Sequence, residues 1–225
     1  MKYNKFLFKE TLLMIIMYIG VVSGIFLMHM LWLKDMPLEK LLLPATLTAA
    51  WLMTSYIFFI DMNNNMISRL IINGGTRSGI WLSKFTVIGV AAVFMSAVQA
   101  AAIVIENGSF EGCFRTILNV TLITILSAMF LGALTALLSV LIKNMSVVVI
   151  LIFAYVCPWT YAMAANCCER SKSVIIRSNP FYSLLKMANT CTFSKVGIIG
   201  CCLTGLLIWI ASFMMIQRKE LKENN

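Results

Sequence analysis

Charged residues are scarce in this 225-residue chain, and acidic residues are scarcer than basic ones. Only 12% of the residues are Asp, Glu, Lys or Arg, whereas 60% are hydrophobic and the mean hydropathy is +0.90. This composition excludes the surface of a soluble protein. Its long apolar runs predict an all-α membrane protein, because a spanning helix bonds every backbone amide internally.

Histidine is almost absent, since His29 is the only one. The sequence contains neither H-E-x-x-H nor a Glu-Glu pair, which argues against an intramembrane metalloenzyme. It also lacks G-x-x-x-x-G-K-[ST], so the chain has no P-loop for a nucleotide. We therefore predict a chain that is not an enzyme and that binds no metal or other cofactor itself.

Acidic residues are missing from the interior of the predicted spans and lie in loops, tails or span ends. Ion-coupled transporters usually carry ionisable groups at mid-membrane. His29, towards the outer end of the first span, is the one candidate for a proton relay, but no acidic partner falls inside any span. The alternative is that His29 faces a helix interface.

Six apolar stretches have the length that a bilayer requires, roughly 20 residues each. The predicted spans are residues 11–33, 41–60, 81–105, 117–142, 145–165 and 196–217. They form a polytopic membrane protein with one domain, residues 1–225. The basic start resembles a signal peptide, but the first apolar run is too long and lacks a small-residue cleavage site, so we expect a retained helix.

Basic residues indicate the orientation, because cytoplasmic loops are enriched in Lys and Arg. With both termini on the cytoplasmic side, that side carries ten of the 18 basic residues: Lys2, Lys5, Lys9, Arg69, Arg77, Lys84, Lys143, Arg218, Lys219 and Lys222. The last outer loop, about residues 166–195, is also basic, and a loop folded back to lipid headgroups explains it. We predict a multi-pass protein of a cell membrane, of the bacterial plasma membrane type.

The net charge of +9 does not indicate nucleic-acid binding, because no basic stripe interleaved with aromatics lies outside the spans. We expect Lys84, Arg218 and Lys219 to extend towards the headgroups of membrane lipids instead.

Cysteines are unevenly placed. An oxidising exterior would allow Cys191 to pair with Cys167 or Cys168. Small-residue packing between helices explains the buried Cys157, Cys201 and Cys202 equally well.

The loop from Asp61 to Lys84 is the most distinctive stretch outside the spans. Asn65 is placed to cap a short helix through Ile72, which Gly74 and Gly75 would end. One face of this helix is apolar and its edge is basic. It would either dock in a groove of a cytosolic partner or rest on lipid headgroups.

Several segments resemble those of ABC-2 type permeases. The order Asp61, Arg69-Leu70-Ile71, Gly74-Gly75, Thr76-Arg77-Ser78 and Trp81-Leu82-Ser83-Lys84 is similar to that family's loop between spans two and three. Asn179-Pro180-Phe181-Tyr182 resembles its outer Asn-Pro-aromatic segment before the last span. The basic ending, residues 216–220, resembles that of the family too.

The resemblance implies partners and further elements. The loop would be a cytoplasmic coupling helix that docks onto ATPase subunits, which would hold ATP and Mg²⁺. A second permease subunit, identical or paralogous, would complete a substrate path, for which the candidates are Trp51, Tyr56, Gln99, Asn119 and Thr124. Gly20 and Gly24 form a G-x-x-x-G at which helices can pack closely.

By the same resemblance, Tyr3–Glu10 would be an N-terminal interfacial helix, although it would otherwise form the first turns of span one. Outer re-entrant helices would lie between spans five and six, with Pro180 setting the bend. Family members of this compact size include bacteriocin and lantibiotic immunity exporters and small drug or peptide exporters.

Two other functions stay open at this point. A membrane scaffold or sensor subunit would have the same spans without depending on a motor. An ion-coupled secondary transporter would run without ATP and would need an ionisable site, for which His29 is the candidate.

Overall fold

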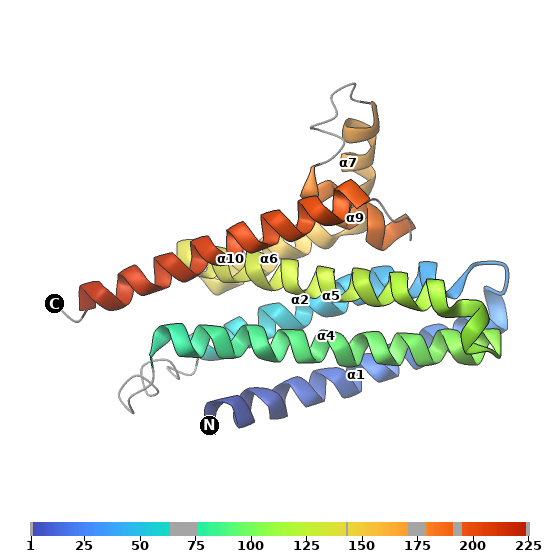
Figure 1. Cartoon of the computed structure of the whole chain (residues 1–225), viewed down its shortest axis with the longest axis horizontal. Helices are drawn as coiled ribbons and strands as arrows, with labels where there is room; N and C mark the ends of the chain where they lie inside the picture. The colour runs from blue at the N-terminus through green and yellow to red at the C-terminus, as the bar shows by residue number, and fades with distance from the viewer. Residues whose placement is uncertain (1, 64–75, 143, 171–178, 191–194, 224–225) are drawn as a thin grey trace.

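The computed structural model describes residues 2–63, 76–142, 144–170, 179–190 and 195–223, and every regular element in these ranges is an α-helix (Figure 1). The helices are α1 (Lys2–Trp32), α2 (Leu38–Asn63), α4 (Arg77–Asn107), α5 (Phe110–Leu141), α6 (Met145–Val156), α7 (Pro158–Arg170), α9 (Pro180–Thr190) and α10 (Lys195–Glu223). The prediction of an all-α protein is confirmed.

Five of the described helices are long and apolar enough to cross a membrane: α1, α2, α4, α5 and α10. A sixth crossing exists if α6 and α7, which meet at a bend of 56°, are counted as one broken span. The predicted span 145–165 is therefore interrupted. Pro158 cannot donate a backbone hydrogen bond and favours an extended residue before it, and Cys157 is extended, with φ −61° and ψ 137°.

The helices form a bundle with α2 and α5 at its centre. Helix α5 packs against α2, α4 and α10, whereas α1 packs against α2 and α4 (Figure 1). Over the apolar window of each helix, 61% of α5 and 56% of α2 is buried, against 22% of α1 and 17% of α10. Helices α1 and α10 therefore lie at the edge of the bundle.

Helix α1 runs without interruption for 31 residues. Tyr3–Glu10, expected as an interfacial helix, continues directly into the first span in this structure, which corresponds to the second of the two alternatives for this segment. At 1.5 Å per residue the helix is about 46 Å long, more than the roughly 30 Å of bilayer hydrocarbon. Its first turns can therefore extend beyond the hydrocarbon to the membrane surface.

A tight turn makes α4 and α5 antiparallel neighbours. Gly108 has φ 68°, a left-handed conformation that favours glycine, and its N–H donates to the carbonyl oxygen of Val104 at 2.9 Å. Ser109 then caps α5, since its Oγ accepts from the Gly112 N–H at 3.4 Å. These two residues end one long helix and start the next.

Close packing between α4 and α5 depends on Gly132. A Cβ atom at that position would lie 3.1 Å from Cδ1 of Ile88, closer than most real contacts allow. Ala91, Ala92 and Ala128 are also completely buried. Small side chains let two spans approach each other where lipid supplies no hydrophobic driving force.

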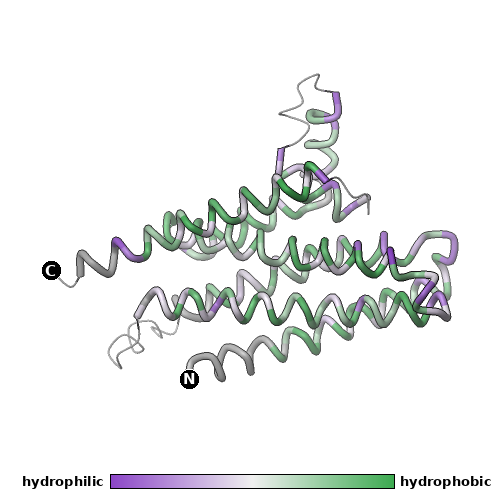
Figure 2. Tube along the Cα trace, in the orientation of Figure 1, coloured by the Kyte–Doolittle hydropathy of each residue, from purple (hydrophilic) through white to green (hydrophobic). Residues whose placement is uncertain are grey.

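Both ends of the described chain lie at the same end of the bundle, together with the end of α2 and the start of α4 (Figure 1). Apolar residues cover the lengths of the helices, while hydrophilic residues gather at helix ends, including the far end of α7, which projects away from the bundle (Figure 2). This is the distribution expected of a protein surrounded by lipid.

Candidate functional site

The predicted docking loop lies between α2 and α4. Asp61 is in the last turn of α2, whereas Arg69, Leu70, Ile71, Gly74 and Gly75 lie outside the described residues. Arg77 is the first residue of α4, and Thr76 caps that helix by accepting the Gly79 N–H on its Oγ1 at 3.1 Å. Ser78 follows in the same turn and is half-buried.

Lys84 is buried, which differs from the headgroup contact expected for it. Its side chain is 5% exposed, and its Nζ lies 4.4 Å from the centre of the Phe58 ring on α2. The electron-rich face of an aromatic ring attracts an ammonium group, more strongly when water is excluded. Lys84 thus connects α4 to α2 close to the end of the predicted docking loop.

An aromatic cluster joins the first turns of α4 to α10. The Trp81 ring centre lies 4.5 Å from that of Phe85, 4.9 Å from that of Trp209 and 5.3 Å from that of Phe213. Trp81 is 3% exposed, and its indole N–H has no hydrogen-bond partner among the described residues. The cluster is a close aromatic contact between the helix that follows the predicted docking loop and the last predicted span.

A hydrogen-bond network joins four helices inside the bundle. Gln99 on α4 donates through Nε2 to the Tyr18 hydroxyl of α1 at 2.7 Å and to Thr46 Oγ1 of α2. Thr124 on α5 donates to Gln99 Oε1 at 2.7 Å, and the Tyr18 and Thr46 hydroxyls are 2.8 Å apart. All four side chains are buried, Gln99 and Thr124 completely.

This network bears on two of the predicted path residues. Gln99 and Thr124 bond to neighbouring helices, which is the usual role of polar side chains in spans. Each hydrogen bond here satisfies a group whose burial would otherwise cost about 1–3 kcal/mol.

The other three path candidates lie on α2 and α5. Trp51 is half-buried between α2 and α6, and its indole N–H donates to the Val149 carbonyl oxygen at 3.1 Å. Tyr56 and Asn119 are half-buried on α2 and α5. Of the five candidates, the structure shows a direct hydrogen bond between Gln99 and Thr124.

His29 has an acidic partner that the sequence did not reveal. Its Nε2 lies 2.6 Å from Oε1 of Glu106, so α1 and α4 are joined by a histidine–carboxylate pair. Glu106 lies one residue beyond the predicted third span, so it is not among the residues inside the spans. The sequence carries a signal for this pair, since both residues lie in the last turns of their helices, which are predicted to end on the same side of the membrane.

The Asn-Pro-aromatic segment starts α9. Asn179 Oδ1 accepts the Phe181 N–H at 2.9 Å, and Pro180 is the first helical residue, where its missing N–H costs nothing. The Phe181 carbonyl oxygen accepts from the Tyr155 hydroxyl at 2.8 Å, which ties the start of α9 to the last turn of α6. The Cys201 thiol donates to the Pro180 carbonyl oxygen at 3.1 Å, which ties the same turn to α10.

Tyr182 links α9 to α7. Its hydroxyl donates to Glu169 Oε1 at 2.7 Å, and the Lys186 ammonium contacts the same oxygen at 2.7 Å. The Tyr182 ring also stacks on Tyr161 at 6.4 Å. Buried residues dominate the rest of α9, so this short helix is held among α2, α5, α7 and α10.

The predicted outer disulfide falls partly outside the described residues, because Cys191 is not among them. Cys167 and Cys168 on α7 both carry free thiols. In the described part of the chain, no three His, Cys, Asp or Glu side chains are grouped to hold a metal ion.

The fold and these contacts define a multi-pass helical membrane protein whose spans are joined by polar and aromatic contacts inside the bundle. No protein-family model matches the sequence, and no curated protein matches it. The function must therefore be inferred from the residues and contacts of this chain.

Proposed function

We propose that this chain is the membrane subunit of an ATP-driven exporter of the ABC-2 permease type. Separate ATPase subunits would bind ATP and Mg²⁺ and would dock on the loop between α2 and α4. The substrate would be a peptide, a drug or a lipid-like molecule, as in bacteriocin-immunity or drug exporters. The chain itself would not be catalytic.

The observation that carries this proposal is the rigid contact of the first turns of α4 with two other helices. Trp81 packs against Trp209 and Phe213 of α10, and Lys84 packs over Phe58 of α2. A force applied to the preceding loop would therefore move α2, α4 and α10 together. Closely packed interfaces transmit such displacements as rigid-body shifts.

The arrangement of the chain ends also supports it. The start of α1, the end of α10 and both helix ends that flank the loop share one end of the bundle (Figure 1). The basic residues of these segments favour the cytoplasmic side for that end. An ATPase would thus meet the loop in the compartment where ATP is available.

The opposite end supports the outer re-entrant helices of the proposed class. Helix α9 has only 11 residues, yet Leu184, Leu185, Met187 and Ala188 are at most 1% exposed. A short helix with such burial is typical of a segment that enters the membrane without crossing it. Asn179 and Pro180 would set its entry.

Helix α1 offers an open surface to a second permease subunit. Cβ atoms added at Gly20 and Gly24 would meet nothing within 4 Å, so no described helix of this chain packs on that face. A homodimer or heterodimer would form there or on the equally exposed α10.

Affinity isolation of the tagged chain in mild detergent tests the proposal. We expect an ATPase with a Walker A sequence to co-purify in stoichiometric amounts, and Arg69→Glu combined with Arg77→Glu to reduce its recovery at least fivefold. Arg115→Glu is the matched control, because Arg115 is an exposed arginine in the first turns of α5 at the opposite end. Unchanged recovery with the double variant would contradict docking at this loop.

One observation favours a second candidate, an ion-coupled transporter. The His29–Glu106 pair is an ionisable site that such a protein requires. Substrate uptake by membrane vesicles, measured with ATP alone and with an ion gradient alone, separates the two. Transport that needs only the gradient and is lost in Glu106→Gln would favour the ion-coupled protein.

A further inference from the structure

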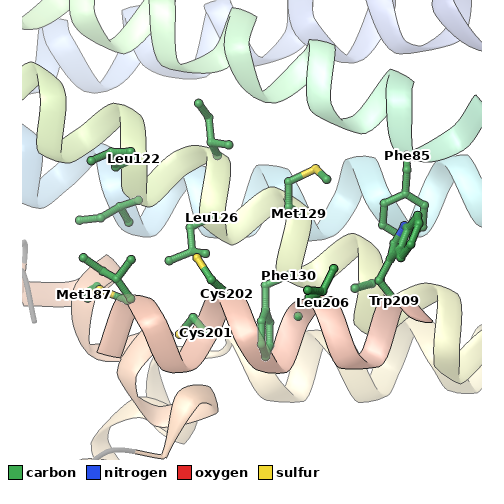
Figure 3. A pocket seen from close by; sticks show the side chains of 15 residues that line it. Phe85, Leu122, Leu126, Met129, Phe130, Met187, Cys201, Cys202, Leu206 and Trp209 are labelled. Atoms are coloured by element: carbon green, nitrogen blue, oxygen red, sulfur yellow. The ribbon is translucent and has the colours of Figure 1, made fainter. Parts of the chain in front are cut away.

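An elongated cavity lies between α5 and α10. Its volume is about 450 Å³, within the range of small-molecule sites in proteins. Met187 of α9 lies at one end, and Phe85 of α4 and Trp209 of α10 lie at the other (Figure 3). The 15 lining residues include no charged side chain and no side chain with an oxygen atom, so the wall offers almost nothing to hydrogen-bond.

The cavity has the length of one leaflet of a bilayer. On α10 its wall runs from Ile198 to Trp209, and on α5 it runs from Leu122 to Ala133. At 1.5 Å per residue each wall is about 16 Å long. Half of the roughly 30 Å hydrocarbon core is about 15 Å.

The cavity opens to the surface of the bundle. Leu122 and Leu206 line it and are 45% and 53% exposed. Both helices are long and apolar enough to cross a membrane, so we expect lipid hydrocarbon around this cavity. Water is a poor occupant, because a buried water needs two to four polar partners.

Charge at the end of the cavity nearest α9 suits a phosphate. Lys195 is exposed and is the first residue of α10, one turn before Ile198. A lysine at this depth can place its ammonium among lipid headgroups while apolar residues below it contact the chains. The shape, the apolar lining and the nearby charge therefore all favour a ligand with an apolar chain and an anionic headgroup.

We propose that this cavity binds one acyl chain of a membrane phospholipid from the leaflet at the α9 end, with the headgroup phosphate at Lys195. The site needs no ATPase and stands apart from the export proposal. The lipid would fill the cavity between α10 and α5, two helices that already pack against each other elsewhere along their length. It would thereby hold the edge helix against the centre of the bundle.

Photolabelling of the full chain in lipid vesicles tests this site. The probe is phosphatidylglycerol with a diazirine in the middle of one acyl chain. We expect labelling of residues 198–209 and 122–133 that saturates, and that falls at least fivefold when unlabelled phosphatidylglycerol competes. Labelling by bulk lipid on the exposed face of α1 should show no such saturation.

Gly205→Leu is the variant that fills the cavity. An added Cβ would lie 3.5 Å from Phe130, an ordinary contact, so the backbone need not move. We expect at least a fivefold loss of the saturable labelling. Gly20→Leu is the matched control, because the same side chain on α1 would meet nothing within 4 Å.

Three results would overturn the proposal. These are unchanged labelling in Gly205→Leu, unsaturable labelling spread evenly over α1 and α10, and crosslinks showing a second copy of the chain seated in the cavity. If Gly205→Leu does not fold, competition on the unaltered chain decides alone. Lys195→Ala should weaken the competition by phosphatidylglycerol about threefold and that by phosphatidylcholine less.

Discussion

The apolar windows of α5 and α10 have the same mean hydropathy, 2.2, yet α5 lies at the centre of the bundle and α10 lies at its edge. Of their apolar windows, 61% of α5 is buried and 17% of α10 is buried. Composition and length predict both as membrane spans. Apolar character therefore places a helix in the membrane, and something else places it within the bundle.

Side-chain size and polar pairing account for the difference. Small and hydroxyl-bearing residues make up much of the buried surface of α5, beside the larger Ile123, Phe130 and Leu131; they include Thr124, Ser127, Ala128, Gly132, Thr135 and Ala136. Large aliphatic residues point outwards from α10, namely Val196, Ile199, Leu203, Leu206, Leu207 and Ile210. In lipid, close approach and interhelical hydrogen bonds drive packing, whereas large aliphatic side chains gain nothing by leaving hydrocarbon.

The largest expected effect comes from removing the close approach at the centre. Gly132→Leu would place its Cβ 3.1 Å from Ile88 and 3.6 Å from Phe85, and the rest of the side chain would have no space. We expect the free energy of unfolding in detergent to fall by about 3 kcal/mol, the upper range for overpacking. Thermal unfolding followed by size-exclusion chromatography measures it. An equal loss in Gly20→Leu would show that packing at Gly132 is not special.

A smaller loss should follow from removing the centre of the hydrogen-bond network. Gln99→Leu leaves the buried hydroxyls of Tyr18, Thr46 and Thr124 with fewer partners, at a cost of about 1–2 kcal/mol. In a double-mutant cycle with Thr124→Val we expect a coupling of about 0.6–1.7 kcal/mol. Strict additivity would mean that the bond between these two residues does not contribute to stability.

A conservative substitution at the contact of α4 with α10 should lower the free energy of unfolding less than the two changes above. Trp81→Phe keeps an aromatic ring against Trp209 and removes a buried N–H that has no partner among the described residues. We expect a change in unfolding free energy below about 1 kcal/mol, since the lost ring area and the removed unpaired group offset each other. Trp81→Ala is the comparison, and it should cost several times more.

The smallest effect belongs to the outer face of α10. Leu207 is 66% exposed, so Leu207→Ala should change the unfolding free energy by less than about 0.5 kcal/mol. The same unfolding measurement checks it. A large loss would mean that this face is covered, as it would be in a dimer.

Much of the fold was predictable because hydropathy and length alone place spans. The five long helices and the all-α class follow from composition. The predicted span 145–165 runs across the break at Cys157, because hydropathy does not register the effect of Pro158 on the backbone of the residue before it. Helix α2 continues through Pro44, so a proline alone does not predict where a helix breaks.

The site was less predictable, because its residues are joined across helices. Gln99 and Thr124 were singled out as polar residues in spans, but their partners Tyr18 and Thr46 depend on how α1 and α2 pack. His29 and Glu106 are 77 positions apart, and only the pairing of α1 with α4 brings them together. Sequence patterns describe single helices, whereas these contacts are properties of the bundle.

The junction of α6 and α9 bears on how the chain enters the membrane during synthesis. Helix α6 is about 18 Å long and α9 about 16 Å, and each is shorter than the roughly 30 Å of hydrocarbon. The Tyr155 hydroxyl bonded to Phe181 joins them end to end. We therefore expect that neither helix inserts into the membrane alone. In a chain that ends at residue 190, a thiol reagent added on the side of synthesis should react with Cys167. In the full chain, the same reagent should not reach Cys167. The last span would then be the element whose arrival completes the assembly of the two shorter helices that precede it.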